Sequence, residues 1–103
     1  MKEELQRLGL SNSEIDVYIA LIKLKSSKAS EVAVNSLKTR EATYYILRNL
    51  TKKGFVTEIK KEGIFYYSPS NLSIIKDHIS SELSEKMDIF ENLIKKYEQT
   101  YGT

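Results

Sequence analysis

Ten basic side chains lie between Lys23 and Lys61, a stretch that contains only three acidic residues. Ammonium and guanidinium groups can neutralise phosphates, and an arginine can also form two parallel hydrogen bonds with the edge of a guanine. From residue 72 onward there are six acidic and four basic residues. This distribution predicts that a polyanion is attracted to the middle of the chain and repelled by its end. The alternative is that the lysines only solvate a helical surface.

Catalytic chemistry has few candidates in this sequence. The single histidine, His78, follows Asp77, and a lone histidine is more often a surface residue than a base or a ligand. The sequence has no cysteine, no glycine-rich phosphate loop and no metal-ligand spacing. We therefore expect no enzymatic activity, no metal and no cofactor.

The basic stretch must be positioned by helices that begin before it. Ser11 and Glu14 have the spacing of a capping box, and residues 17–22 form an unbroken apolar run, which predicts a buried central helix over 11–24. Ala29, Val32 and Ala33 then give a short second helix one narrow apolar face. The central helix is expected to act as scaffold.

A third helix is predicted from Thr39, as N-cap, to about Lys53, where Gly54 ends it. One side of this helix is expected to pack and carries Thr43, Tyr44, Leu47, Leu50 and Thr51. The other side is expected to face outward and carries Glu41, Tyr45, Arg48, Asn49 and Lys52.

Residues 55–60 and 64–68 are rich in aromatic and β-branched side chains and flank Gly63, a pattern that predicts an antiparallel hairpin. Lys60 and Lys61 lie near its tip, whereas Tyr66 and Tyr67 are expected to pack. The predicted fold class is mainly α with a small β-hairpin, a winged helix-turn-helix followed by a long C-terminal dimerisation helix.

Apolar residues recur every three or four positions in the last thirty residues, which predicts one helix about 45 Å long. Each apolar side chain left in water forfeits about 1.5–3 kcal/mol of burial, so we expect homodimerisation through a coiled-coil seam. The alternative is that the helix folds back along its own domain. The expected division is a DNA-binding domain over 1–71 and a pairing helix over 72–103. The seam comprises Leu72, Ile75, Ile79, Leu83, Met87, Phe90, Ile94, Tyr97 and Tyr101.

An ordered set of residues in the first part of the chain is shared with one known family: Leu8-Gly9-Leu10, Glu14, Tyr18, Leu21, Ala29-Ser30-Glu31-Val32-Ala33, Arg40, Tyr44, Leu47, Leu50, Lys53-Gly54, Val56, Tyr67, Pro69 and Leu72. Through these residues the first 72 positions resemble the N-terminal domain of TrmB-type archaeal transcriptional regulators, a winged-helix group related in shape to MarR-type repressors. Family members usually carry glycine where this chain has Lys25 and Leu37; we expect Leu37 to fill the core, with Asn35 or Ser36 absorbing the backbone strain. Larger relatives continue into a sugar-binding domain, which we do not expect here, so the effector is unknown.

The resemblance implies DNA binding by a dimer, with the third helix, about residues 39–53, in the major groove and the wing, about residues 60–64, on the backbone. Arg40 is the expected base contact, while Glu41 either tunes specificity or stabilises the helix N-terminus. The other side chains expected near DNA are Lys38, Thr39, Tyr45 and Arg48, with Lys28, Lys60 and Lys61 on phosphates.

The predicted function is a homodimeric, sequence-specific regulator that binds a pseudo-palindromic site in double-stranded DNA. The alternative is a winged-helix protein-interaction module of the transcription machinery, with a coiled-coil partner. Because no apolar run approaches the ~20 residues needed to cross a bilayer and no signal peptide is evident, we expect a cytoplasmic protein.

Overall fold

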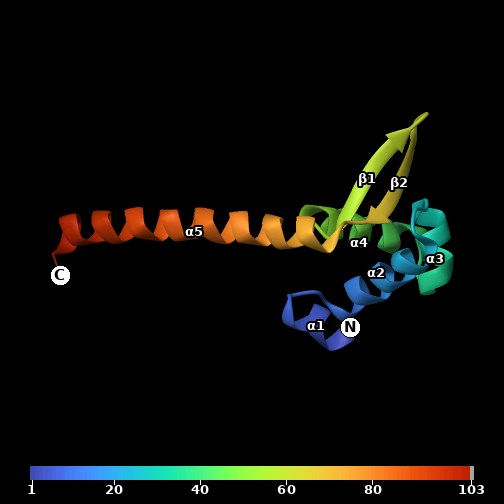
Figure 1. Cartoon of the computed structure of the whole chain (residues 1–103), viewed down its shortest axis with the longest axis horizontal. Helices are drawn as coiled ribbons and strands as arrows, with labels where there is room; N and C mark the ends of the chain where they lie inside the picture. The colour runs from blue at the N-terminus through green and yellow to red at the C-terminus, as the bar shows by residue number, and fades with distance from the viewer. Residues whose placement is uncertain (103) are drawn as a thin grey trace.

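A computed structural model describes residues 1–102, in which a helical domain carries a β-hairpin and one long helix projects from it (Figure 1). The predicted fold class is confirmed. The elements are α1 (Lys2–Arg7), α2 (Asn12–Leu24), α3 (Ala29–Ser36), α4 (Arg40–Lys52), β1 (Val56–Lys61), β2 (Ile64–Pro69) and α5 (Leu72–Tyr101).

Helices α2 and α4 begin at the caps that the sequence predicts. The Ser11 hydroxyl accepts from the Glu14 amide at 3.2 Å, and the Ser11 amide donates to Glu14 Oε1 at 2.8 Å, which completes the capping box. At α4, the Thr39 hydroxyl accepts from the Ala42 amide at 3.1 Å. These caps fix the start of the scaffold helix and of the candidate recognition helix.

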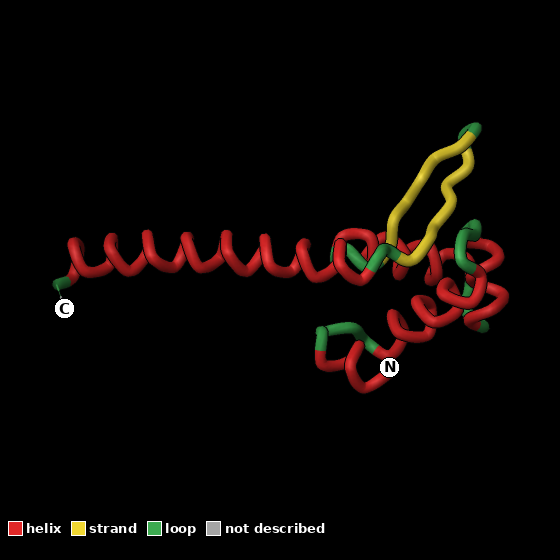
Figure 2. Tube along the Cα trace, in the orientation of Figure 1, coloured by secondary structure: helices red, strands yellow, loops and turns green. Residues whose placement is uncertain are grey.

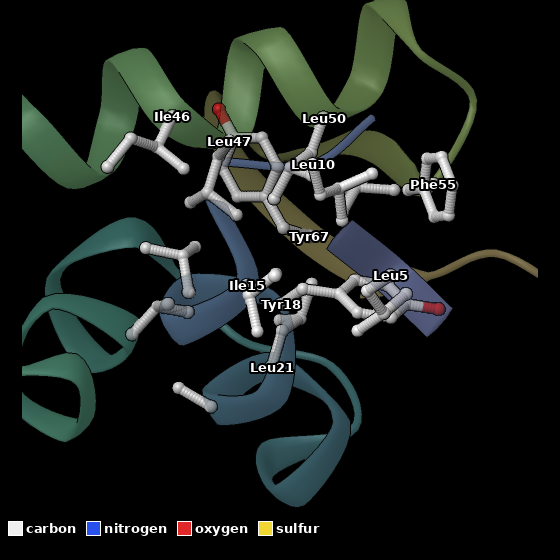
Figure 3. Packing of buried hydrophobic residues seen from close by; sticks show 14 of the residues in the cluster. Leu5, Leu10, Ile15, Tyr18, Leu21, Ile46, Leu47, Leu50, Phe55 and Tyr67 are labelled. Carbon is white, nitrogen blue, oxygen red and sulfur yellow. The ribbon is translucent and has the colours of Figure 1, made fainter. Parts of the chain in front are cut away.

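The core forms around α2, which packs against α3, α4 and β2 (Figure 3). Ile15, Leu21, Leu47 and Tyr67 are completely buried in it. The central position of α2 is as expected, although its apolar run is not buried all round, because Ile19 remains half-exposed. The helix therefore supports the site without contributing to it.

The packed side of α4 differs from the prediction, since Ile46 is buried, Tyr44 is exposed and Thr51 is only partly buried. Its buried residues, Thr43, Ile46, Leu47 and Leu50, follow the i, i+3, i+4, i+7 spacing of one helix face. Tyr44, which was expected to pack, is 38% exposed. This side chain is consequently available at the surface.

The hairpin is antiparallel, with pairs running from Val56 and Pro69 at its base to Lys61 and Ile64 at its tip. The loop residues Glu62 and Gly63 have φ of 50° and 79°, as a type I′ turn requires. Ser27 adds a short third strand-like segment, since its amide and carbonyl both hydrogen-bond the backbone of Tyr67, at 2.9 and 2.8 Å.

Lys25 and Leu37, the two positions where the resemblance leads us to expect glycine, both adopt positive φ. At Lys25 (φ 70°, ψ −68°) the Ser26 amide donates to the Leu24 carbonyl at 2.9 Å, a strained γ-turn. Leu37 itself is left-handed (φ 56°, ψ 44°) and its side chain is 93% exposed. The expectation that Leu37 fills the core is wrong, because ending α3 requires the left-handed conformation at this residue.

Helix α5 leaves the domain after its first two turns (Figure 2). Ile75 is 4% exposed and belongs to the domain core, so its assignment to the dimer seam is wrong. The His78 ring packs on Gly54, where a Cβ would lie 2.8 Å from its Cδ2 atom. From Ser80 on, the helix is exposed and extends away from the domain, which excludes the fold-back alternative. No described helix is both long and apolar enough to span a bilayer.

Candidate nucleic-acid interface

A groove of about 490 Å³ opens where the N-terminal ends of α3 and α4 face strand β2. We call it the basic groove; its lining includes Lys28, Ser30, Arg40, Glu41, Tyr44 and Phe65. Three of the predicted contact residues, Lys28, Arg40 and Glu41, are thereby brought together. The two cations face one carboxylate, so the groove favours an anionic ligand.

The N-terminus of α3 contributes free hydrogen-bond donors to this groove. Its N-cap residue, Lys28, provides no side-chain acceptor for the helix amides. The amides of Ala29 and Ser30 have no acceptor within the helix, and none is found for them among residues 1–102. Helix N-termini with free amides attract anions.

The exposed side of α4 carries much of the predicted set of contact residues. Arg40, Glu41, Tyr45 and Arg48 are all exposed. Thr39 is exposed too, although its hydroxyl is already engaged as the helix cap. These side chains remain exposed although α5 is present, and the described part of α5 projects away from the domain (Figure 1).

Lys38 is placed differently from the prediction. Its side chain is only 20% exposed, and its Nζ atom lies 3.6 Å from Asp16 Oδ2 on α2. A partly covered ammonium already paired with a carboxylate is poorly placed for a phosphate. Lys38 is therefore better described as a tie between the turn and the scaffold helix.

Tyr44 and Arg48 form a pair that the sequence did not reveal. Arg48 Nη1 donates to the Tyr44 hydroxyl at 3.1 Å, and the guanidinium carbon lies 5.8 Å from the centre of the Tyr44 ring. The i, i+4 spacing on one helix face could have signalled the contact. The pKa of Arg48 is raised, first by Tyr44 and then by the charge of Glu58 on the wing.

The two wing lysines point to opposite faces of the hairpin, because successive side chains of a strand alternate. Lys60 pairs across the strands with Phe65, and its ammonium lies 5.4 Å from the centre of that ring. Phe65 lines the basic groove, so Lys60 is on the groove side. Lys61 is directed to the opposite face, close to the turn.

Tyr67 underlies the groove with an unpartnered hydroxyl. The residue lines the groove yet is completely buried, and its hydroxyl has no hydrogen-bond partner among the described residues. Burial raises the pKa of Tyr67, and Glu58, its cross-strand neighbour, raises it further. The expectation that Tyr67 packs is confirmed.

Helix α4 is anchored to the scaffold at its far end. Lys53 Nζ lies 2.8 Å from Glu14 Oε1 and 3.2 Å from the Gly9 carbonyl oxygen. Burial alone would raise the pKa of Glu14, but hydrogen bonds from Lys53 and from the Ser11 amide, together with the Lys53 charge, hold it below its ordinary value. The sequence predicted only the capping role of Glu14.

The predicted seam of α5 is exposed from Ile79 onward. Leu83, Met87, Phe90 and Ile94 are each more than half exposed, a large apolar surface for a domain of this size. The helix carries three further exposed apolar residues that the predicted seam did not include: Ile74, Ile89 and Leu93.

A helix-turn-helix with a β-hairpin wing and a basic groove between them defines a winged-helix DNA-binding protein. The family model for the sugar-specific transcriptional regulator TrmB matches residues 5–73. The chain belongs to the TrmB family, which consists of transcriptional regulators and not of enzymes.

Known relatives agree with this assignment. The chain is 32% identical over 99 residues to the HTH-type sugar sensing transcriptional regulator TrmBL1 of Pyrococcus furiosus, covering 96% of this chain but 28% of that protein. The archaeal chromatin protein TrmBL2 superposes with a TM-score of 0.62 at 25% identity, over 98% of this chain and 42% of its own. The chain thus spans less than half the length of either relative.

The fold extends to bacterial regulators at lower identity. YusO of Bacillus subtilis superposes with a TM-score of 0.60 at 19% identity, over 94% of this chain and 80% of its own. The multiple antibiotic resistance repressor MarR gives 0.58 at 14% identity, over 95% of this chain and 72% of its own. These similarities establish a shared fold.

Proposed function

We propose that this regulator acts as a homodimer that binds a specific, pseudo-palindromic sequence in double-stranded DNA. Helix α4 would enter the major groove with Arg40 toward the bases, and the hairpin would lie on the backbone with Lys60 and Lys61 near phosphates. The observation that carries this proposal is the uncovered side of α4 beside the basic groove. A regulator with this function would work in the cytoplasm.

The proposed dimer rests on the exposed apolar seam of α5. Residues 1–71 would bind DNA, and 72–103 would pair, with the exception of Ile75, which the domain itself buries. A two-fold axis along the paired helices would present two α4 helices to half-sites about 34 Å, or a multiple of it, apart. A seam of this kind supports pairing because it removes apolar surface from water.

Selection of bound sequences from a random pool of duplex DNA tests the proposal. We expect a symmetric consensus, recovered at moderate salt, and a dimeric mass in light scattering. A monomer that binds all sequences weakly, and only at low salt, would instead favour the protein-interaction module.

A further inference from the structure

The hydrogen bond between Tyr44 and Arg48 determines whether the Tyr44 hydroxyl can donate a hydrogen bond to another group. A guanidinium has only donors, so in the 3.1 Å hydrogen bond the Tyr44 oxygen is the acceptor. The proton of the Tyr44 hydroxyl is therefore not used by Arg48. It remains available to an acceptor outside the pair.

Tyr44 lines the basic groove, where other donors are also directed. Lys28 and Arg40 supply positive charge, Ser30 supplies a hydroxyl, and the free amides at the start of α3 add two more N–H groups. Glu41 is the only carboxylate in the lining. Tyr67 also lines the groove, but its hydroxyl is buried near the Glu58 carboxylate of the wing and is not counted among the donors. This set of groups matches a ligand that only accepts hydrogen bonds and carries negative charge.

We propose that the basic groove is a phosphate-binding site for one phosphodiester of the DNA backbone, with Tyr44 as a neutral donor and Arg48 as the residue that positions it. The proposal rests on the proposed DNA binding. Arg48 polarises the Tyr44 O–H bond by donating to its oxygen, which strengthens the donor. Arg48 thus acts through Tyr44.

Tyr44→Phe removes only the hydroxyl. Binding to the selected duplex should weaken by about tenfold for each half-site, the value of one hydrogen bond to a charged acceptor. The salt dependence should stay unchanged, because a neutral donor releases no counterion. Lys28→Gln should instead lower the salt slope by about 0.9 for each half-site. Tyr66→Phe, the same change on a tyrosine outside the groove lining, is the matched control and should bind as wild type does.

Two arms identify the phosphate and the role of Arg48. A scan of single methylphosphonates along the duplex should find one position in each half-site that weakens binding of wild type about tenfold and leaves binding of Tyr44→Phe unaffected. Arg48→Lys, which keeps the charge, should weaken DNA binding about threefold in the wild-type background. The same substitution should not change DNA binding in the Tyr44→Phe background.

Each outcome decides the matter. Wild type that binds no duplex overturns both the DNA-binding proposal and this site. Wild type that binds while Tyr44→Phe matches it overturns only the site. Inorganic phosphate that displaces DNA from wild type, but not from Tyr44→Phe, at matched ionic strength would assign the groove to a free anion and overturn the backbone assignment.

Discussion

Lys53, the residue after α4, reaches across 39 positions of sequence to place its ammonium 2.8 Å from the buried carboxylate of Glu14. The same carboxylate closes the capping box of α2. One side chain therefore fixes both the start of the scaffold helix and the end of the candidate recognition helix. The contact ties the end of α4 to the start of α2.

Removing the ammonium should destabilise the domain. Lys53→Met leaves Glu14 buried without its partner, and we expect the free energy of unfolding at pH 7 to fall by about 1–2 kcal/mol. Urea unfolding measures the change. Lys52→Met, on the exposed neighbour, is the control and should change stability little. If both variants changed the free energy of unfolding equally, the contact between Lys53 and Glu14 would not contribute to stability beyond that of an exposed lysine.

The pH dependence of the same pair has a defined sign. Because the folded pKa of Glu14 lies below its ordinary 4.5, the contribution is present above 4.5 and is lost as pH falls through the folded value. The difference in unfolding free energy between wild type and Lys53→Met should be constant near neutrality and shrink below about pH 4.5. A difference that persists unchanged in acid would point to another partner for Lys53.

Leu37→Gly should stabilise the domain, because glycine adopts the left-handed conformation without strain and the exposed leucine side chain loses little packing. We expect a net gain of about 0.5–1 kcal/mol, seen as a higher melting temperature without DNA. Leu37→Ala retains the strain and serves as control. If Leu37→Gly had a melting temperature no higher than that of Leu37→Ala, the left-handed backbone at this residue would not be strained.

Arg40→Ala and Lys61→Ala should separate the recognition of base sequence from the positioning of the protein on the DNA backbone. Loss of Arg40 should cost about 1–3 kcal/mol on the selected sequence and relax its consensus at one position. Loss of Lys61 should weaken all sequences alike and lower the salt slope by about 0.9 for each half-site. Quantitative electrophoretic shifts on specific and scrambled duplexes measure both. If the two variants behaved alike, the assignment of Arg40 to bases and of Lys61 to phosphates would be wrong.

Phe90→Glu should convert the dimer to a monomer. A charge at an exposed seam position cannot be buried without a partner, so pairing should weaken by several kcal/mol. Sedimentation across a range of concentrations measures it, with Asn92→Glu on the other side of α5 as control. Should Phe90→Glu remain a dimer, pairing does not run through this seam.

The fold was largely predictable because each element carries a local signal. Ser11 and Glu14 mark the start of α2, Thr39 marks the start of α4, and the spacing of apolar residues marks α5. The candidate site was less predictable than the fold. Arg40 and Glu41 could be named from their place on α4, but the partners of Lys38 and Lys53 lie on α2, which is distant in sequence. Periodicity also cannot distinguish a residue such as Ile75, which the domain buries, from the seam that continues beyond it.

The contact between His78 and Gly54 has a consequence for the operator. Since α5 packs on the backbone where α4 ends, the axis of α5 and that of α4 keep one mutual orientation. Two copies joined along α5 would present their reading helices at a single spacing and on one face of the duplex. Such an operator tolerates changes in the composition of its spacer but not in its length, because about five added base pairs turn one half-site to the opposite side.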